Sequence, residues 1–477
     1  MSSSSRAVRA FTAVAVSVAS IALLQNLVIP VLPMIEAGFD VGPDVAAWTM
    51  TAWLVAAAVA TPLLGRVGDL RGRRGTLLTV LVLVILGDFI AALAPNIGIL
   101  IAGRVLQGAG GATFPLAFAL LRETMPAARL TAAIGSVSAL VGIGGAAGSV
   151  LAGPLAGVIG WRGLFSVALG VTALAAVLVL AWLPRHGLRA AGRLNARSGV
   201  LLSAWLVALL VPVSSGSSWG WASPLTVGLF AAAFVLLIAW VFSELRSAAP
   251  LVDVRMLAHR AIWPVNAAAL LIGIAVFGFW GYLPLFLEVP ASTGWALGLS
   301  AEAAGLVLVP LLVGMSLAGF ATGWLSRLIS LRAQLVSGST LLGLAVIGAV
   351  LFHGQVWQLA VVGGLFGIGV GAAYAAMASI VVESVPADSV GVATGVNANL
   401  RSIGQAIGSA LMSAMVFGAL DVHGAPFEGS YTTAWLTIAV TGLLAAALVV
   451  LIRTRRRVPA PVTIERTTQR EDYADAA

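Results

Sequence analysis

The stretch LGRVGDLRGRRG at residues 64–75 holds four arginines and an aspartate. The apolar runs LVAAAVATPL and LLTVLVLVIL flank it, although charged residues make up only 9% of the chain. Two apolar runs of helix length joined by a short basic loop are typical of two membrane-spanning helices and their connection. The stretch therefore predicts a membrane hairpin, and the same pattern continues along the rest of the chain.

The composition is that of an integral membrane protein. Of the 477 residues 60% are hydrophobic, and the mean hydropathy of +1.04 lies far above the range of soluble proteins. Apolar stretches recur at about the 20 residues that a helix needs to cross a bilayer, which excludes the short alternating strands of a barrel. The sequence predicts an all-α integral membrane protein with fourteen spans, beginning near residues 11, 45, 75, 97, 131, 162, 198, 224, 262, 302, 333, 357, 389 and 433.

The arginines indicate how the chain is oriented. All 26 basic residues are arginine, and the net charge is +8. With a cytoplasmic amino terminus, the outer segments hold Arg162 and six acids, namely Glu36, Asp40, Asp44, Glu288, Asp421 and Glu428. This positive-inside pattern predicts a multi-pass protein of the cell membrane with both termini in the cytoplasm, and it leaves no basic patch for nucleic acid. The inner segments hold Arg66, Arg71, Arg73, Arg74, Arg122, Arg129, Arg185, Arg189, Arg193, Arg197, Arg246, Arg255, Arg260, Arg327, Arg332, Arg453, Arg455, Arg456 and Arg457.

Patterns of catalytic chemistry are missing from the sequence. The chain has no cysteine, and the longest outer loops, EAGFDVGPD and LDVHGAPFEGSY, lack paired histidines and metal-ligand spacing. A nucleotide-binding P-loop does not occur either. We therefore expect no enzyme activity, no catalytic residue, no metal, no cofactor and no ATP-driven pumping. A polytopic membrane enzyme is the alternative that these loops disfavour.

The chain repeats itself at a constant offset of 260 residues. ETMPAARLTAAIG at 123–135 matches ESVPADSVGVATG at 383–395, and the register continues through Gly144 with Gly404 and Gly148 with Gly408. Spans 1 to 6 and 9 to 14 are therefore two copies of a six-helix unit, and such repeats around a midplane site are typical of transporters. We expect an N-terminal bundle at 1–184, two inserted helices at 185–260, a C-terminal bundle at 261–455 and a disordered tail at 456–477.

The composition of residues 64–75 predicts more than a topology signal. Four glycines permit a tight turn, and Asp69 comes just before the third span, where free N–H groups and the helix dipole favour a carboxylate. A charge cluster that forms in one arrangement of the two bundles and breaks in the other would be a gating latch. The alternative is that the arginines only set orientation, which needs neither the aspartate nor the glycines. The predicted latch comprises Gly65, Asp69, Gly72, Arg73 and Arg74.

The run Gly65, Val67, Asp69, Gly72, Arg73, Arg74 resembles the signature loop of the major facilitator superfamily, G-x-L-x-D-R-x-G-R-K, with Leu70 where an arginine is frequent. A degenerate copy, GWLSRLISLR at 323–332, occupies the equivalent loop of the second half, with Arg327 in place of the aspartate. The resemblance implies the major facilitator fold, two six-helix bundles plus two inserted helices. It also implies that only the first half carries the full latch.

Further motifs resemble the fourteen-span drug:proton antiporter branch. GRVLQGAGGATFP matches the fourth-span motif R-x-x-Q-G, and GIGGAAGSVLAGPLAG resembles the fifth-span antiporter motif G-x-x-x-G-P-x-x-G-G, although Ser149 replaces its proline and Ala152 a glycine. WRGLF at 161–165 and PLVDVRML at 250–257 add to the likeness. An isolated G-x-x-x-G would only indicate close helix packing. The antiporter-motif residues are Gly144, Gly148, Gly153 and Pro154.

Two charges fall deep inside predicted spans. Asp88 and Arg104 lie on consecutive helices, at roughly 10 to 12 Å from the outer end of their hairpin, where they can meet as a pair. Because ionisable residues in a membrane are costly, they indicate function. Asp88 is either the proton-coupling site, with Arg104, or one half of a structural ion pair that never titrates. Arg401 is expected near the inner end of its span, neutralising helix ends.

The sequence thus predicts proton-coupled export of small amphipathic molecules, such as drugs or antibiotics, by a monomer in contact with lipid. Proton-coupled uptake of a metabolite is the alternative. By analogy with the superfamily, the substrate cavity would draw on Gln25, Asn26, Arg104, Phe114, Trp280 and Tyr374, each of which could instead only pack. Leu24 replaces the first-span aspartate of the branch, so we expect neutral or anionic substrates to be preferred over dications.

Overall fold

The computed structural model describes residues 3–185, 190, 193–247, 250–260, 262–418, 420 and 425–451, and the regular secondary structure within them is helical apart from one isolated bridge between Leu420 and Pro426. The predicted tail at 456–477 lies outside the described residues. The elements are α1 (Ser3–Leu27), η1 (Ile29–Val31), α2 (Leu32–Phe39), α3 (Pro43–Arg71), α4 (Arg73–Ala92), α5 (Ile97–Gln107), η2 (Gly108–Ala112), α6 (Thr113–Thr124), α7 (Ala127–Trp182), α8 (Ala196–Trp219), α9 (Pro224–Arg246), α10 (Val254–Leu257), α11 (Trp263–Trp280), α12 (Leu283–Glu288), η3 (Ala291–Thr293), α13 (Ala301–Val307), α14 (Val309–Leu325), α15 (Leu331–Leu351), α16 (Val356–Ser384), α17 (Val390–Val416) and α18 (Glu428–Leu451).

The helices correspond to the predicted spans. In the described part of the chain, thirteen helices are long and apolar enough to cross a membrane. The further predicted span coincides with α17, which is 27 residues long but carries Asn397, Asn399, Arg401 and Gln405, so its mean hydropathy is low. The all-α membrane fold is confirmed, and the predicted span in α17 is the one that hydropathy alone passes over.

Helix α7 contains two predicted spans. Its 56 residues run through Gly160, where φ is 73° and ψ is 164°, a conformation that glycine tolerates and other residues resist. Arg74, at the start of α4, donates to the carbonyl oxygens of Val179 and Leu180 near the end of α7. The end of α7 therefore returns to the face of the bundle on which α4 begins, which we call the N-terminal face.

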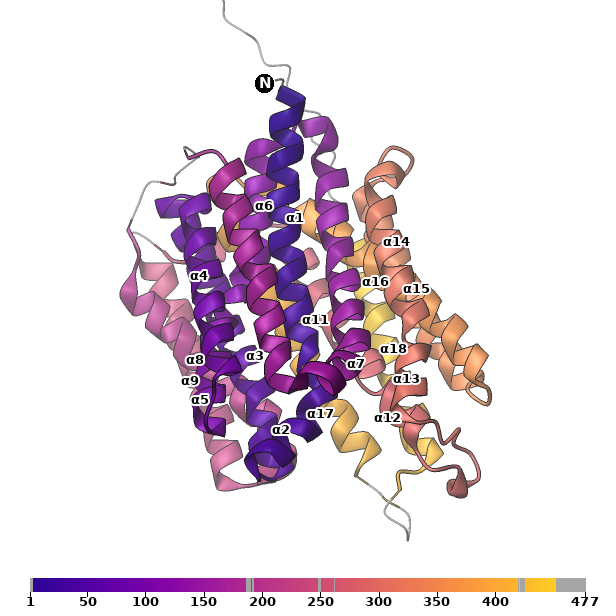
Figure 1. Ribbon diagram of the computed structural model, residues 1–477. Coiled ribbons are helices and arrows are strands. Elements are labelled where there is room, and N and C mark those ends of the chain that lie inside the picture. Colours follow the sequence, from indigo (N-terminus) through magenta and orange to yellow (C-terminus); the bar gives the residue numbers. More distant parts are fainter. Residues whose placement is uncertain are drawn as a thin grey trace, which may run out of the picture.

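The long helices form two groups, visible in Figure 1 as indigo to magenta helices and as orange to yellow helices. Helix α7 packs on α1 and α4 in the first group, and α17 packs on α11 and α18 in the second. The groups meet where α3 contacts α17 and where α7 contacts α14. The inserted helices α8 and α9 pack on each other, and α8 contacts both α3 and α17.

Glycines permit the closest helix packing within each group. A Cβ added at Gly144 would lie 2.6 Å from the Cβ of Ala22, and one added at Gly148 would lie 2.7 Å from the carbonyl oxygen of Leu23, both on α1. In the second half, the equivalent glycines of α17 press in the same way on the backbone of α11. Both halves have this glycine pair, so we infer that it allows close packing between the first and fifth helices of each repeat.

The remaining two residues of the antiporter motif do not share this packing. A Cβ added at Gly153 would meet nothing within 4 Å, and Gly153 and Pro154 are both exposed on α7. In this conformation they line neither the α1 contact nor the cavity described below.

The outer surface of the bundle is apolar. Val158 on α7 is 84% exposed, and Phe234 on α9 is 65% exposed. Such side chains on the outside of a helical bundle are suited to lipid and not to water, because the backbone polar groups are already bonded within the helices. The protein is therefore a multi-pass membrane protein, as its composition predicts.

Candidate functional site

The predicted latch begins at a turn of one residue. Helix α3 runs through Arg71 and α4 begins at Arg73, so Gly72 alone lies between them, with φ 109° and ψ 129°. This left-handed conformation favours glycine. All four glycines of the stretch were expected in the turn, but Gly65 and Gly68 are in α3 and Gly75 is in α4.

Asp69 connects the two halves of the molecule. Its side chain is fully buried in the last turn of α3. Its carboxylate accepts hydrogen bonds from the backbone N–H of Gly391, at 3.2 Å, and of Val392, at 2.9 Å. These are free N–H groups in the first turn of α17, where the helix dipole also favours negative charge. Asp69 was expected to bind the free N–H groups of the third span, but the helix end that it binds belongs to the other half. Its expected pairing with a nearby arginine is observed with Arg73.

Arg73 completes the cluster. It donates from Nε and Nη2 to Asp69 Oδ1, at 3.2 and 2.9 Å, and from Nη1 to Glu123, at 2.7 Å. It also donates to the carbonyl oxygen of Ala387 in the second half. Arg74 points elsewhere, to the end of α7, and so stabilises the first half internally. The charge cluster at this position consists of Asp69, Arg73 and Glu123, and Glu123 was not among the predicted residues although the sequence repeat displays it.

Arg122 makes a second connection between the halves at the same face. Its guanidinium donates to the carbonyl oxygen of Val385, at 2.7 Å, and to that of Val382, both near the end of α16. At the repeat offset of 260 residues, Arg122 corresponds to Val382 itself. A residue that touches its own equivalent lies on the approximate two-fold axis relating the two halves, so Arg122 marks that axis at the N-terminal face.

Both contacts between the halves are closest toward the N-terminal face. A Cβ at Gly65 of α3 would lie 2.7 Å from the carbonyl oxygen of Gly391 on α17. In the equivalent contact, a Cβ at Gly135 of α7 would lie 2.5 Å from the carbonyl oxygen of Gly319 on α14. Deeper in the bundle, Asn399 adds a hydrogen bond of 2.7 Å to the carbonyl oxygen of Ala58. The bundle is thus closed at this face.

The equivalent loop of the second half lacks the carboxylate contact. Arg327, which stands where the first half has Asp69, is exposed. The first turn of α7 is instead contacted from α16, where Glu383 accepts a hydrogen bond of 3.2 Å from the hydroxyl of Thr131. The two sides of the closed face are therefore built differently.

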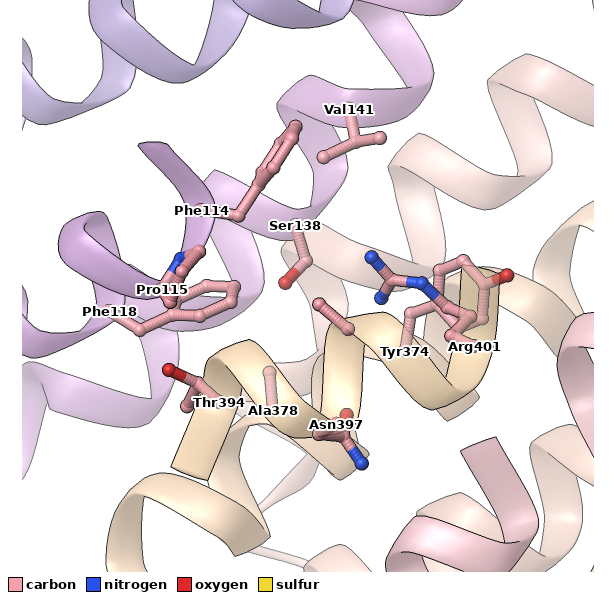
Figure 2. A pocket seen from close by; sticks show the side chains of 11 residues that line it. Phe114, Pro115, Phe118, Ser138, Val141, Tyr374, Ala378, Thr394, Asn397 and Arg401 are labelled. Carbon is pink, nitrogen blue, oxygen red and sulfur yellow. The ribbon is translucent and has the colours of Figure 1, made fainter. Parts of the chain in front are cut away.

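A small cavity lies between the halves, deeper than the latch (Figure 2). Its volume of about 30 Å³ has room for a water molecule or two, so in this conformation it is too narrow for an organic molecule. It is lined by Phe114, Pro115 and Phe118 of α6, Ser138 and Val141 of α7, Tyr374 and Ala378 of α16, and Thr394, Asn397, Ala398 and Arg401 of α17.

The cavity surrounds the two-fold axis. Its lining contains four pairs of residues separated by the repeat offset, Phe114 with Tyr374, Phe118 with Ala378, Ser138 with Ala398, and Val141 with Arg401. A cavity lined by equivalent positions of both halves changes shape whenever the halves move relative to each other. It therefore has the position that alternating access requires of a substrate site.

Two of the predicted cavity residues, Phe114 and Tyr374, line this cavity, and the others do not. Asn26 donates to the carbonyl oxygen of Ala22 on its own helix, at 3.0 Å. A Cβ at Gly145 would lie 3.9 Å from Trp280 and 3.3 Å from Asn26, so both lie beside α7 beyond the cavity. Gln25 is half-buried on α1 outside the lining.

Arg401 also lines the cavity, although it was not among the predicted cavity residues. It lies eleven residues beyond Val390, about 16 Å along α17 and so close to the middle of a bilayer core. The expectation that it lies at the inner helix end is wrong, and the helix rise alone gives the right depth. Its guanidinium carbon stands 4.5 Å from the centre of the Tyr374 ring, a cation–π contact.

Asp88 and Arg104 are linked through Gln107. All three side chains are fully buried. Gln107 donates to Asp88 Oδ1, at 2.8 Å, and accepts from Arg104, at 2.7 Å. Arg104 also donates to the carbonyl oxygen of Thr49, at 3.0 Å. The expected direct ion pair is not present among the described contacts, and Asp88 Oδ2 has no hydrogen-bond partner among the described residues. Gln107 lies one turn from Arg104 in the R-x-x-Q-G motif, so the sequence contained this signal.

The sequence pattern of the Major Facilitator Superfamily matches residues 14–295 and 267–474. The multidrug resistance protein Stp of Mycobacterium tuberculosis is 28% identical over 83% of this chain and 72% of its own length. The tetracenomycin C resistance and export protein of Streptomyces glaucescens is 28% identical over 85% of this chain and 75% of its own. The cephamycin export protein CmcT of Amycolatopsis lactamdurans is 30% identical over 87% of this chain and 86% of its own.

Solved structures share the fold at low sequence identity. The human organic anion transporter MFSD10 superimposes with a TM-score of 0.67 at 17% identity, covering 93% of this chain and 99% of its own. The proton:xylose symporter XylE gives 0.65 at 12% identity, covering 94% of this chain and 95% of its own. These likenesses establish the arrangement of helices and leave the substrate open. By the extent of the sequence match and by its fold, the chain belongs to the Major Facilitator Superfamily.

Proposed function

We propose that the protein exports small amphipathic organic molecules, such as drugs or antibiotics, across the cell membrane in exchange for protons. The observation that carries this proposal is the similarity, over more than four fifths of the chain, to three proteins named for resistance or export. The chemistry is transport without a cofactor, with the proton gradient as the energy source and a monomer as the working unit.

Alternating access gives the mechanism. The two halves, near 1–184 and 261–455, rock about the cavity that lies on their two-fold axis. In the conformation described here, Asp69, Arg73, Glu123 and Arg122 hold the N-terminal face shut. For the opposite conformation to form, the bonds from Asp69 to α17 and from Arg122 to α16 must break. The latch thus contributes to the free-energy difference between the two states.

The arginine distribution supports placing the N-terminal face in the cytoplasm. Arg71, Arg73, Arg74, Arg122 and Arg327 all belong to that face, where α3, α6 and α14 end. Arg162, beyond Gly160 at the opposite end, stacks on Trp161 at 4.2 Å and donates to the carbonyl oxygen of Ala94. Under the positive-inside rule both chain termini then face the cytoplasm.

Asp88 is our candidate for the proton carrier. A fully buried carboxylate that leaves one oxygen without a partner is costly when ionised, and taking up a proton removes that cost. Gln107 connects it to Arg104, whose carbonyl acceptor Thr49 belongs to α3, the helix that also carries Asp69. A change of protonation at Asp88 can therefore alter the hydrogen bonds that reach α3, the helix that closes the N-terminal face.

Transport into inverted membrane vesicles tests the function. Vesicles containing the protein should accumulate substrates found in a drug-susceptibility panel of an efflux-deficient host, and a protonophore should abolish the accumulation. The matched control is the same membrane carrying the Asp69→Asn variant at equal abundance. Accumulation in right-side-out vesicles instead would show proton-coupled uptake of a metabolite, the alternative function.

A further inference from the structure

The arginines placed inside the bundle differ in how well they are bonded. Arg73, Arg104 and Arg122 each donate to carboxylate, amide or carbonyl oxygens. Arg401 makes no hydrogen bond and no ion pair with any residue that the structure describes, and its one described close contact is the Tyr374 ring. A guanidinium without a protein acceptor is available to bind an anion, because its five N–H groups can all donate to the ligand. Arg401 is only partly buried, and its guanidinium belongs to the cavity lining, so the cavity presents a positive charge to which none of the described residues offers an acceptor.

The cavity lining is chemically one-sided. At equivalent positions the first half presents Phe114 and Val141, and the second half presents Tyr374 and Arg401. Phe118 extends the apolar side. Figure 2 shows the guanidinium of Arg401 lying against Tyr374 and directed across the gap toward Ser138. A ligand on the axis would thus meet aromatic rings on one half and a positive charge on the other.

We propose that this cavity binds aromatic organic anions, with the acidic group on Arg401 and the ring system against Phe114 and Phe118. The proposal rests on the proposed function, because the narrow cavity admits such a ligand only when the halves move apart. A carboxylate or sulfonate can accept two parallel hydrogen bonds from the N–H groups of a guanidinium, which gives a strong and directional contact. The Tyr374 ring holds the guanidinium in place for it.

Equilibrium binding to the purified full chain in phosphatidylcholine nanodiscs tests the proposal. The probes share one ring system and differ in charge: 1-naphthaleneacetate, its neutral amide 1-naphthaleneacetamide, and the cation 2-(1-naphthyl)ethylammonium. The anion should bind about 10-fold more tightly than the amide, the effect of one hydrogen-bonded charge contact, and the cation should bind more weakly than both. Equal binding of anion and amide would overturn the proposal.

Variants test whether the preference for the anionic probe depends on Arg401. Arg401→Gln should bind the anion and the amide alike, Arg401→Lys should keep a reduced preference, and Phe118→Ala should weaken all three probes together. The control Arg327→Gln makes the same charge change on an exposed residue and should behave as the unaltered protein. A preference for the anion that survives Arg401→Gln would contradict the assignment.

Two further measurements separate the alternatives. Adding phosphatidylglycerol to the nanodiscs should leave the binding of 1-naphthaleneacetate unchanged, whereas strong competition would mean that Arg401 pairs with lipid head groups and would overturn the proposal. Transport in inverted vesicles is scored separately from binding. Export without an anion preference in binding would refute this inference alone, and an anion preference without export would refute the proposed function alone.

Discussion

At the scale of single residues, Asp69 joins the two halves of the molecule through its carboxylate. Its carboxylate serves two helices at once, accepting from Arg73 on α4 and from two backbone N–H groups of α17. The negative charge is what both contacts share, because a helix amino end and a guanidinium each favour an anion. Removing the charge while keeping the shape should therefore destabilise the closed face without unfolding the protein.

The variant Asp69→Asn should lower transport about 10-fold or more while membrane abundance stays near normal, since charge-assisted bonds are replaced by weaker neutral ones. Uptake into inverted vesicles, normalised to protein amount, measures this. The matched control is Asp44→Asn, which makes the same change on an exposed residue in the first turn of α3. Full activity of Asp69→Asn would show that the loop serves topology only.

Asp88→Asn tests proton coupling. The amide oxygen of Asn can still accept from Gln107, so the protein should be expressed normally, bind substrate and perform downhill exchange. Proton-driven accumulation should be lost, because the amide cannot take up and release the coupled proton. Glu302→Gln, an exposed change in the first turn of α13, is the control.

Two other outcomes of this experiment are informative. If Asp88→Asn is poorly inserted and the double variant Asp88→Asn with Arg104→Gln recovers expression, Asp88 has a structural role only. A well-expressed Asp88→Asn protein that still transports uphill would remove Asp88 from the proton pathway.

At the scale of helices, the sequence was sufficient to predict where the helices lie along the chain. It was insufficient to predict which side of each helix faces the cavity or the other half. Apolar length predicted the spans, and the repeat predicted which helices are equivalent. Helix α17 shows what is lost: its polar residues were visible, but whether Arg401 faces a cavity depends on how α6, α7 and α16 surround it. Likewise Asp69 was expected to serve the neighbouring helix, because sequence distance does not tell which helix end lies across the bundle.

The contact between α3 and α17 depends on the absence of a side chain at Gly65. The variant Gly65→Ala would place a Cβ 2.7 Å from a backbone oxygen of α17, so the closed face should open more often. The chain has no cysteine, so Ser138→Cys in the cavity provides a single reporter thiol. An impermeant maleimide should label it about 5-fold faster or more from the cytoplasmic side when Gly65→Ala is present, for an overpacking cost of about 1 kcal/mol or more.

The control for this experiment is Gly75→Ala in α4, where an added Cβ would meet nothing within 4 Å. It should leave the labelling rate of the reporter unchanged. An equal rate in the Gly65→Ala and Gly75→Ala backgrounds would mean that the α3 to α17 contact does not control access.

At the scale of the whole molecule, the arginine asymmetry and the even number of predicted spans make one joint prediction. Reporter fusions after Arg185 and after Arg457 should both report a cytoplasmic location, because an even number of crossings separates each of them from a cytoplasmic amino terminus. A phosphatase fusion active only outside and a fluorescent protein that folds only inside give opposite signals at each position. An external signal after Arg457 would contradict the fourteen-span arrangement.

The position of Arg122 also bears on how such a molecule can arise from two copies of one half. In a symmetric pair of identical halves, the residue on the axis would face its own copy, so two guanidinium groups would repel each other at the point where one now binds carbonyl oxygens. Valine at this position in both halves would leave the carbonyl oxygens at the helix ends without a hydrogen-bond donor. A duplicated ancestor could therefore close this face in the present way only after its copies had diverged at this position.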